Sequence, residues 1–352
     1  MAATVPKEIC ILRLSAIGDC CHVVPVVNTL RRAWPQARLT WIVGKVEASL
    51  VGDIPGIEFV VLDKGAGWRG YAALRRKLQG RRFDLLLHMH ASMRANLVSL
   101  LVKSPRRLGF DRSRARDRQW IFTNERIAQR PRQHVLDGLF GFAEHLGITD
   151  RDLRWEIPVS TADRAAMAAM VDNDRPLLVI SPCSSQRLRN FRNWHVDRYI
   201  EVARHAIGRY GMQVAVSGGN TELEHDYGRQ MCAADPANIS NLVGKTSLKQ
   251  LLALLERAQA VLCPDSGPAH MATAAGTPVI GLYATSNPGR TGPYLSRQWV
   301  VDKYPQAVAA EFGKKVEDLR WGTRVRNPEA MDLITVSEVN ARLDELLAGI
   351  SG

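Results

Sequence analysis

The sequence of 352 residues lacks the features that define several classes of protein. No uninterrupted apolar run approaches the ~18 residues of a membrane-spanning helix, which excludes such a span. The N-terminus has no apolar run of the signal-peptide kind before Asp19, so we expect a cytoplasmic protein. None of the six cysteines belongs to a C-x-x-C pair, which argues against a zinc site or a disulfide framework. No low-complexity tract is present, and ~150 residues per domain predicts about two domains.

Acidic residues are in the minority: 35 Asp and Glu stand against 47 Lys and Arg, which gives a net charge of +12. Such an excess is typical of a protein with an anionic partner, whether nucleic acid, an acidic membrane surface or a phosphorylated substrate. No recognised nucleic-acid module is visible, so we expect no nucleic-acid partner. Much of the excess lies in one segment, for which a solvated basic loop is the simplest interpretation: Arg106, Arg107, Arg112, Arg114, Arg116 and Arg118.

Short apolar runs alternate with helical patterns, and the alternation restarts halfway along the chain. We expect strands at 9–14, 39–43, 57–62 and 84–88, and again at 177–181, 213–217, 260–263 and 278–283. Strands that alternate with helices predict an α/β fold with parallel sheets covered on both faces. In two such halves, ligands bind at the carboxyl ends of the strands, and a cleft between the halves is the default site.

The first motif, LSAIGD at residues 14–19, closes the first expected strand and opens a helix. Gly18 permits a tight turn. Asp19 has two interpretations: a residue that caps the helix and favours its dipole, or a carboxylate that takes a proton from an incoming hydroxyl. The motif is not the G-x-G-x-x-G fingerprint, so a dehydrogenase loses its main support.

The second motif, VLCPDSGPAH at residues 261–270, takes a buried strand through a sharp loop into a helix. Ser266 or Gly267 suits the helix cap, and Pro268 suits the first helical position. The N–H groups at the start of such a helix form an anion site. The alternative is an ordinary strand-to-helix turn, but Asp265 and His270 fall in the same six residues.

Two further motifs follow strands of the second half. Ser184 and Ser185 come after the strand at 177–181 and precede several arginines, which suits a diphosphate unless this is simply a mobile basic loop. In the segment 217–224, Thr221 and Glu224 have the spacing of a capping box. Glu222 is therefore the residue that could bind both hydroxyls of a ribose, unless it only favours the helix dipole.

Together these motifs resemble glycosyltransferase family 9, the ADP-heptose:lipopolysaccharide heptosyltransferases. The resemblance is carried by ILRLSAIGDCCHVVPVVNTLRRAWPQARLTWIV near the start and by LVGKTSL with AQAVLCPDSGPAHMATAAGTPVIGLYATSNPGR later in the chain. It implies a GT-B fold, with two Rossmann-like domains that face a cleft. We expect an acceptor-binding domain at 1–165, a nucleotide-sugar domain at 166–335, and a C-terminal helix at 336–352 that packs back across the domains.

The same resemblance assigns roles to individual residues. Asp19 is the implied base, and the loop lysine of the family matches Arg192, with Arg189 as the alternative. The resemblance and the basic segment make Gly18, Arg112, Arg114 and Arg116 the expected acceptor site. The expected donor site comprises Ser184, Ser185, Arg192, Glu222, Asp265, Ser266, Gly267 and His270.

The implied reaction is an inverting transfer of heptose from ADP-heptose to the inner core of lipopolysaccharide, on Kdo or on a first heptose. We expect no metal, because no acidic pair has a metal-holding spacing, and no other cofactor. Relatives with a cysteine-ligated iron carry C-terminal cysteines that this sequence lacks. The basic segment is expected to contact lipid A–Kdo and the anionic inner leaflet. The alternatives are transfer of another nucleotide-linked sugar to a glycan or protein, a nucleic-acid-binding protein, and an inactive scaffold.

Overall fold

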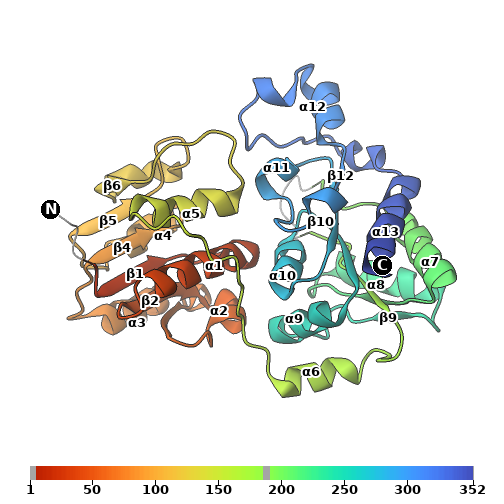
Figure 1. Cartoon of the computed structure of the whole chain (residues 1–352), viewed down its shortest axis with the longest axis horizontal. Helices are drawn as coiled ribbons and strands as arrows, with labels where there is room; N and C mark the ends of the chain where they lie inside the picture. The colour runs from red at the N-terminus through yellow and green to blue at the C-terminus, as the bar shows by residue number, and fades with distance from the viewer. Residues whose placement is uncertain (1–4, 185–190, 352) are drawn as a thin grey trace. The chain divides into compact units, whose positions relative to one another are not determined.

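The computed structural model describes residues 5–184 and 191–351 of the chain. The chain divides into two compact units, an N-terminal unit of residues 1–158 and a C-terminal unit of residues 159–352 (Figure 1). The sequence predicted a division after residue 165. Helix α6 (Thr161–Ala168) instead belongs to the C-terminal unit, where it packs against α9 (Leu248–Arg257).

The core of the N-terminal unit is a six-stranded parallel sheet in the order β3-β2-β1-β4-β5-β6. The central strands are buried apolar runs because helices cover both faces of the sheet. Since β1 pairs with both β2 and β4, the residues that follow these three strands meet at one edge. The strands are β1 (Glu8–Leu12), β2 (Arg38–Gly44), β3 (Ile57–Leu62), β4 (Leu85–His88), β5 (Arg106–Gly109) and β6 (Glu125–Arg126).

Two helices, α3 (Trp68–Leu78) and α4 (Met93–Ser99), bury their inner sides against one face of this sheet. Leu12 of β1 shares that core with Leu74 of α3 and Val98 of α4. Right-handed crossovers place the helices that connect β1, β2 and β3 on the opposite face. The helices there are α1 (Ile17–Ala33) and α2 (Lys45–Val51), and α5 (Val135–His145) packs against α1.

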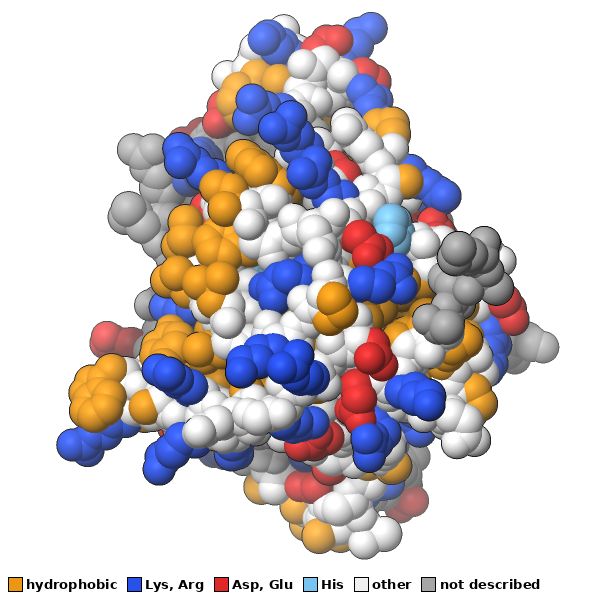
Figure 2. All heavy atoms as spheres, turned by 90° about the vertical axis from the view of Figure 1, so that its left-hand side faces the viewer, with side chains coloured by type: hydrophobic (Ala, Val, Ile, Leu, Met, Phe, Trp, Pro, Cys, Tyr) orange, Lys and Arg blue, Asp and Glu red, His pale blue; other side chains and the backbone are white. Residues whose placement is uncertain are grey.

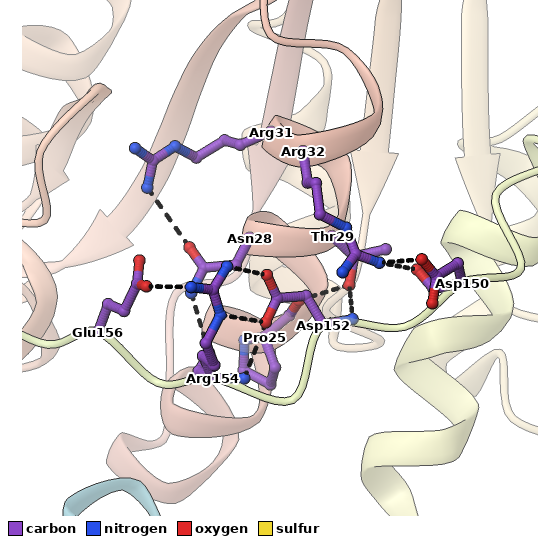
Figure 3. Close-up of polar contacts among 9 residues, drawn as sticks. All are labelled: Pro25, Asn28, Thr29, Arg31, Arg32, Asp150, Asp152, Arg154 and Glu156. Carbon is purple, nitrogen blue, oxygen red and sulfur yellow. Dashed lines mark hydrogen bonds and ion pairs between the residues drawn. The ribbon is translucent and has the colours of Figure 1, made fainter.

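The segment after α5, at residues 150–156, runs along α1 and is hydrogen-bonded to it (Figure 3). The Asp152 N–H donates to Thr29 Oγ1 at 2.8 Å, and Asn28 Nδ2 donates to the Arg154 carbonyl at 2.9 Å. Trp155 adds a hydrogen bond of 2.8 Å from its indole N–H to the Cys21 carbonyl. These contacts keep the chain in the N-terminal unit as far as its boundary at Pro158.

The C-terminal unit repeats the construction, with a parallel sheet in the order β12-β11-β10-β7-β8-β9. The ends of β11, β10, β7 and β8 lie side by side, so the residues after them meet at one edge. The strands are β7 (Leu177–Ile180), β8 (Gln213–Val216), β9 (Ile239–Asn241), β10 (Ala260–Pro264), β11 (Val279–Tyr283) and β12 (Val301–Asp302).

The last helix, α13, buries Val339, Leu343 and Leu346 in the core of the C-terminal unit and packs against α7. The helix that the sequence predicted at residues 336–352 is therefore present, and its buried side belongs to the core of the C-terminal unit. The helices of this unit, besides α6 and α9, are α7 (Val196–Tyr210), α8 (Glu222–Ala234), α10 (Gly267–Ala275), α11 (Pro288–Thr291), α12 (Tyr304–Phe312) and α13 (Val336–Ser351).

The two parallel sheets with flanking helices confirm the predicted α/β class, and all eight predicted strands are present within one or two residues. The prediction missed the outer strands β5, β6, β9 and β12. In particular, Arg106 and Arg107 belong to strand β5 and not to a loop. Within the described residues, no helix has the length and apolar character needed to cross a membrane.

Candidate functional site

The first candidate site lies where β1 of the N-terminal unit ends and α1 begins. Asp19 is the third residue of α1, and its side chain is 35% exposed. Asp19 Oδ2 accepts a hydrogen bond of 3.3 Å from the Ala16 N–H, so the residue does cap the helix as one interpretation of the sequence predicted. The cap leaves the carboxylate accessible at the carboxyl edge of the sheet, where the second interpretation requires it.

Arg13 is the partner that the sequence analysis missed. Its guanidinium forms an ion pair with Asp19 Oδ2, and only 10% of its side chain is exposed. Arg13 also donates to the Ser15 carbonyl at 2.9 Å and to the Met89 carbonyl at 2.7 Å. Because carbonyls that follow β1 and β4 hold the guanidinium in place, Arg13 holds the Asp19 carboxylate in one orientation.

Three more polar side chains surround this turn. His90 Nδ1 accepts a hydrogen bond of 3.1 Å from the Leu14 N–H, and burial, assisted by the charge of Arg13, lowers the pKa of His90 to about 3. The ring is therefore neutral at pH 7. Lys64 Nζ lies 3.4 Å from the Leu14 carbonyl and 3.9 Å from the buried Glu47 carboxylate. These residues follow β4 and β3 and begin α2, so they converge from separate parts of the chain.

Two glycines contribute to this edge in different ways. Gly18 is buried in the first turn of α1 and does not have a positive φ, so the sharp part of the turn precedes it. Gly44, at the end of β2, is where glycine is required: a β-carbon there would collide with the Leu14 carbonyl and the Glu47 carboxylate. The tight turn that we expected at Gly18 is therefore made by the residues before it.

The arginines of the basic segment fall into two groups. The guanidinium groups of three of them are bound by other parts of the N-terminal unit. Arg106 forms a bidentate pair with Glu125 at 2.7 and 2.9 Å. Arg107 donates to backbone carbonyls, one of them that of Phe122 at 2.8 Å, and burial lowers the pKa of its guanidinium. Arg114 pairs with the buried carboxylate of Asp111.

The other three arginines are exposed and lie on or beside the 3-10 helix η2 (Arg116–Ile121). Arg112 lies over the ring of Trp120, with 5.7 Å between its guanidinium carbon and the ring centroid. Of the predicted acceptor residues, Arg112 and Arg116 present their charge to solvent, whereas Arg114 is held by Asp111.

The second candidate site lies at the carboxyl edge of the C-terminal sheet. Asp265 follows β10 directly, and its side chain is 7% exposed. Arg192 Nη1 donates to the Asp265 carbonyl at 2.7 Å and lies 3.4 Å from its carboxylate. Arg324 approaches the same carboxylate at 3.8 Å and is 46% exposed. One buried acid thus gathers two cations at this edge.

The second motif forms the start of α10. Ser266, one of the two predicted caps, is the N-cap. Gly267 is the first helical residue, so Pro268 is the second, whereas the sequence predicted it as the first. His270 lies in the same turn with 9% of its surface exposed. The N–H groups and the dipole of this helix point to the edge where Arg192 and Asp265 lie, which is the arrangement that binds an anion.

The loop after β7 is described only in part. The N–H and Oγ of Ser184 donate to Asn193 Oδ1 at 2.9 and 3.0 Å, which joins the two ends of the loop. Ser185 and the alternative cation Arg189 lie outside the described residues. Asn193, which the sequence analysis missed, therefore positions Ser184.

The fourth motif has the predicted capping box. Thr221 and Glu224 exchange hydrogen bonds, and Glu224 also accepts from the Gly219 N–H at 2.8 Å. Glu222 is exposed at the first position of α8 and forms no hydrogen bond or ion pair with the residues that the structure describes. The structure therefore separates the structural carboxylate, Glu224, from the one that faces solvent.

The chemistry of the two edges differs. The N-terminal edge offers an accessible carboxylate that can take a proton from a hydroxyl. The C-terminal edge offers cations and a helix N-terminus that suit a diphosphate. Among residues 5–184 and 191–351, no group of three or more His, Cys, Asp or Glu side chains has the arrangement of a metal site.

Comparison with known proteins agrees with this chemistry. Residues 71–319 match the model of glycosyltransferase family 9 (heptosyltransferase). The chain is 40% identical to the lipopolysaccharide core heptosyltransferase OpsX of Haemophilus influenzae, over 97% of each chain. Its fold is similar to that of ADP-heptose lps heptosyltransferase II of E. coli, with a TM-score of 0.74, 21% identity and coverage of 98% and 100%. The E. coli heptosyltransferase WaaC with ADP gives a TM-score of 0.73 at 16% identity, with coverage of 96% and 99%.

Proposed function

Since the chain belongs to glycosyltransferase family 9, we propose that it transfers heptose from ADP-heptose to the inner core of lipopolysaccharide. The 40% identical relative is named for heptosyl transfer to the lipopolysaccharide core, and two structures of similar fold are named for ADP or ADP-heptose. The observation that carries the proposal is the pairing of Arg192 and Arg324 with Asp265 beside the N-terminus of α10.

In the proposed reaction the C-terminal unit binds the donor. Arg192, the α10 N-terminus and Ser184 bind the diphosphate, and Glu222 binds the ribose hydroxyls. Negative charge grows on the β-phosphate as ADP leaves, and these groups stabilise it because they are already oriented towards it. Arg324 joins this set because the same carboxylate holds it beside Arg192.

The N-terminal unit supplies the base. A hydroxyl of the acceptor attacks the anomeric carbon of heptose on the face opposite ADP. The new C–O bond forms as the bond to the β-phosphate oxygen breaks, and the hydroxyl proton passes to the Asp19 carboxylate. Direct displacement of this kind inverts the anomeric configuration. Arg13 is a positioning residue, since it contacts Asp19 and not the substrate in this scheme.

The proposal includes three finer points. The transfer needs no divalent metal, because arginines and a helix N-terminus oppose the diphosphate charge. The acceptor is an anionic glycolipid core, either Kdo or a first heptose, and the exposed Arg112 and Arg116 favour its approach. Gly18 lies next to Asp19 in the first turn of α1, where the acceptor hydroxyl must arrive. The reaction takes place at the cytoplasmic face of the inner membrane.

The direct test is a transfer assay with purified protein, ADP-heptose and a delipidated core acceptor, followed by mass spectrometry. We expect the acceptor to gain one heptose, and EDTA to leave the rate unchanged. Acceptors that end in Kdo and in heptose, assayed in parallel, identify the acceptor. Transfer from another nucleotide-linked sugar but not from ADP-heptose would refute the proposed donor, and a rate abolished by EDTA and restored by a divalent ion would refute metal independence.

A further inference from the structure

The outer sides of α3 and α4 form a surface that the proposed transfer chemistry does not use. A groove of about 690 Å³ runs between the two helices. Three of its lining residues come from α3, and three come from α4 and the turn after it. They are Tyr71, Ala72, Arg75, Arg94, Leu97 and Leu101. We call this surface the α3–α4 face.

The α3–α4 face exposes an unusual amount of apolar side chain. Trp68 is 75% exposed at the start of α3, and Met93, Leu97 and Leu100 are 47%, 55% and 62% exposed along and just after α4. Ile121, 66% exposed, lies on η2, which contacts α4. Figure 2 shows a face on which hydrophobic side chains gather beside those of Lys and Arg. A contiguous exposed apolar patch of this kind marks an interaction site.

The two helices of the α3–α4 face carry charge of one sign, and the adjoining η2 adds Asp117, whose carboxylate accepts a hydrogen bond from the Met93 N–H. Four basic residues and no acidic residue lie in α3, and Arg94 is the charged residue of α4. Arg75 and Arg94 line the groove from its two sides, and both are exposed. Basic side chains mixed with Trp and Leu are typical of surfaces that lie in the interface of an anionic membrane. The charge of the two helices therefore fits anionic lipid headgroups. It does not fit a protein partner whose surface carries both acidic and basic residues.

The position of this face relative to Asp19 supports the same partner. Trp68 and Met93 are the first residues of α3 and α4, which start from the carboxyl edge of the N-terminal sheet. Asp19 lies at that edge after β1, which pairs directly with β4. An acceptor hydroxyl carried on a membrane lipid reaches Asp19 most easily if the surface beside this edge lies on the membrane.

From these observations we infer that the α3–α4 face docks on an anionic lipid bilayer. Trp68, Leu97 and Leu100 enter the boundary between headgroups and acyl chains, while Arg75 and Arg94 contact lipid phosphates. The inference deepens the proposed function, on which it rests for the lipid-linked acceptor, by naming the surface that meets the membrane. Binding to vesicles needs neither substrate, so it can be measured independently of transfer.

The test is flotation of the full chain with vesicles of phosphatidylcholine alone and of phosphatidylcholine with phosphatidylglycerol. The wild-type chain should bind the anionic vesicles, and high salt should weaken the binding. The pair Arg75→Gln with Arg94→Gln should weaken it about thirtyfold, at ~1 kcal/mol for each charge. The pair Leu97→Ser with Leu100→Ser should weaken it about tenfold. Exposed side chains rarely affect folding, so these variants should remain folded.

Matched controls come from the C-terminal unit. Arg204→Gln with Arg320→Gln removes the same charge from exposed positions, and Leu295→Ser with Leu333→Ser removes two exposed leucines. Neither control pair should change binding by more than about twofold. Equal losses in control and test pairs, or equal binding to both kinds of vesicle, would overturn the inference. So would a wild-type chain that dimerises through this face, monomerises in the leucine variant and binds no vesicle.

A second readout separates this inference from the proposed function. The α3–α4 variants should keep the wild-type kcat/KM on a delipidated core acceptor and lose rate only on acceptor embedded in anionic vesicles. If wild type transfers heptose but binds no vesicles, the docking surface is wrong and the function stands. If it binds anionic vesicles through this face but transfers heptose to no acceptor, the function is wrong and the surface stands as a lipid-binding site.

Discussion

The two carboxyl edges use the same pair of residue types in opposite ways. At the N-terminal edge the arginine is the more buried partner, with Arg13 10% and Asp19 35% exposed. At the C-terminal edge the acid is the more buried partner, with Asp265 at 7% and its two arginines at 12% and 46%. The more exposed partner is the one that can meet a substrate. Arg13 thus positions an acid, and Asp265 positions cations.

This difference matches the chemistry that the proposed function requires of each edge. A base must reach a hydroxyl, and an ion pair with a fixed guanidinium orients its carboxylate. A diphosphate needs cations that do not reorganise when charge develops on the leaving group. Ion pairs of similar composition therefore have different roles, which exposure and the direction of the other hydrogen bonds reveal.

The largest expected effect is that of Asp19→Asn, which removes the proposed base and keeps the shape of the side chain. We expect kcat to fall by ~10²–10⁴, as is usual when a general base is lost. Steady-state kinetics with saturating ADP-heptose measures this. If the variant keeps more than about a third of the wild-type kcat, Asp19 is a helix cap and not the base, because loss of a general base lowers kcat far more than this.

A smaller effect is expected for Arg13→Gln, because Arg13 acts through Asp19. We expect kcat to fall roughly 10–100-fold while the KM for ADP-heptose is unchanged, since a misplaced base slows chemistry and not donor binding. Arg13→Lys should recover part of the loss because it restores the charge without the guanidinium geometry. A merely structural role for Arg13 would lower the unfolding free energy and leave the kcat of the folded fraction intact.

The two units should also differ in their response to acid. His90 has a pKa of about 3 in the folded N-terminal unit because it is buried near Arg13, and 6.5 is its ordinary value. The unfolded chain therefore binds the proton more readily, so stability falls as the pH drops from about 6.5 towards 3. At pH 5 the loss from His90 is about 2 kcal/mol.

Urea unfolding at pH 7.5, 6.5 and 5 measures this loss. The variant His90→Gln, whose side-chain oxygen can still accept from the Leu14 N–H, should flatten the decline. The control His195→Gln, at an exposed position in the C-terminal unit, should leave it unchanged. An unaltered decline in the His90 variant would show that another group causes the acid sensitivity.

The smallest effect concerns the basic segment. Arg112→Gln with Arg116→Gln should raise the KM of the anionic acceptor about three- to tenfold and reduce its dependence on salt, because both side chains are exposed. Arg114→Gln should instead lower the unfolding free energy by ~1–2 kcal/mol, since the buried Asp111 carboxylate loses its cationic partner and keeps only its hydrogen bonds from Ser113. Initial rates at low and high salt measure the change in KM, and urea unfolding measures the change in unfolding free energy. Equal effects of the three substitutions on the acceptor KM would contradict the distinction between the exposed arginines and the one that pairs with Asp111.

Local rules predicted the parts of the molecule that depend on neighbours in sequence. The strand β3 was predicted with its observed bounds, because an apolar run between turn residues determines it. The capping box of Thr221 and Glu224 follows from the spacing of the two residues. The glycine and proline of the second motif narrowed the cap of α10 to Ser266 or Gly267, and the structure has Ser266.

Contacts between distant residues were beyond the sequence. Strand β5 was missed because Arg107 gives it a polar sequence. The carbonyls that accept hydrogen bonds from this arginine belong to Val102, before the strand, and Phe122, after it. Arg324 could not be assigned to Asp265, since only the fold brings the two together. Arg13 had one usable signal: it is a charge at the end of a buried strand, directly before the motif that contains Asp19.

The central claim is that the N-terminal edge supplies the base and the C-terminal edge binds the diphosphate. Calorimetric titration of ADP into Asp19→Asn, Arg192→Ala and Arg324→Ala tests it most directly. We expect the Kd of Asp19→Asn to equal that of wild type, and the Kd of Arg192→Ala to rise ~10–100-fold with the loss of charge-assisted hydrogen bonds. Arg324→Ala, which removes the more exposed cation, should raise the Kd less. Weaker ADP binding by Asp19→Asn together with unchanged binding by both arginine variants would contradict the account.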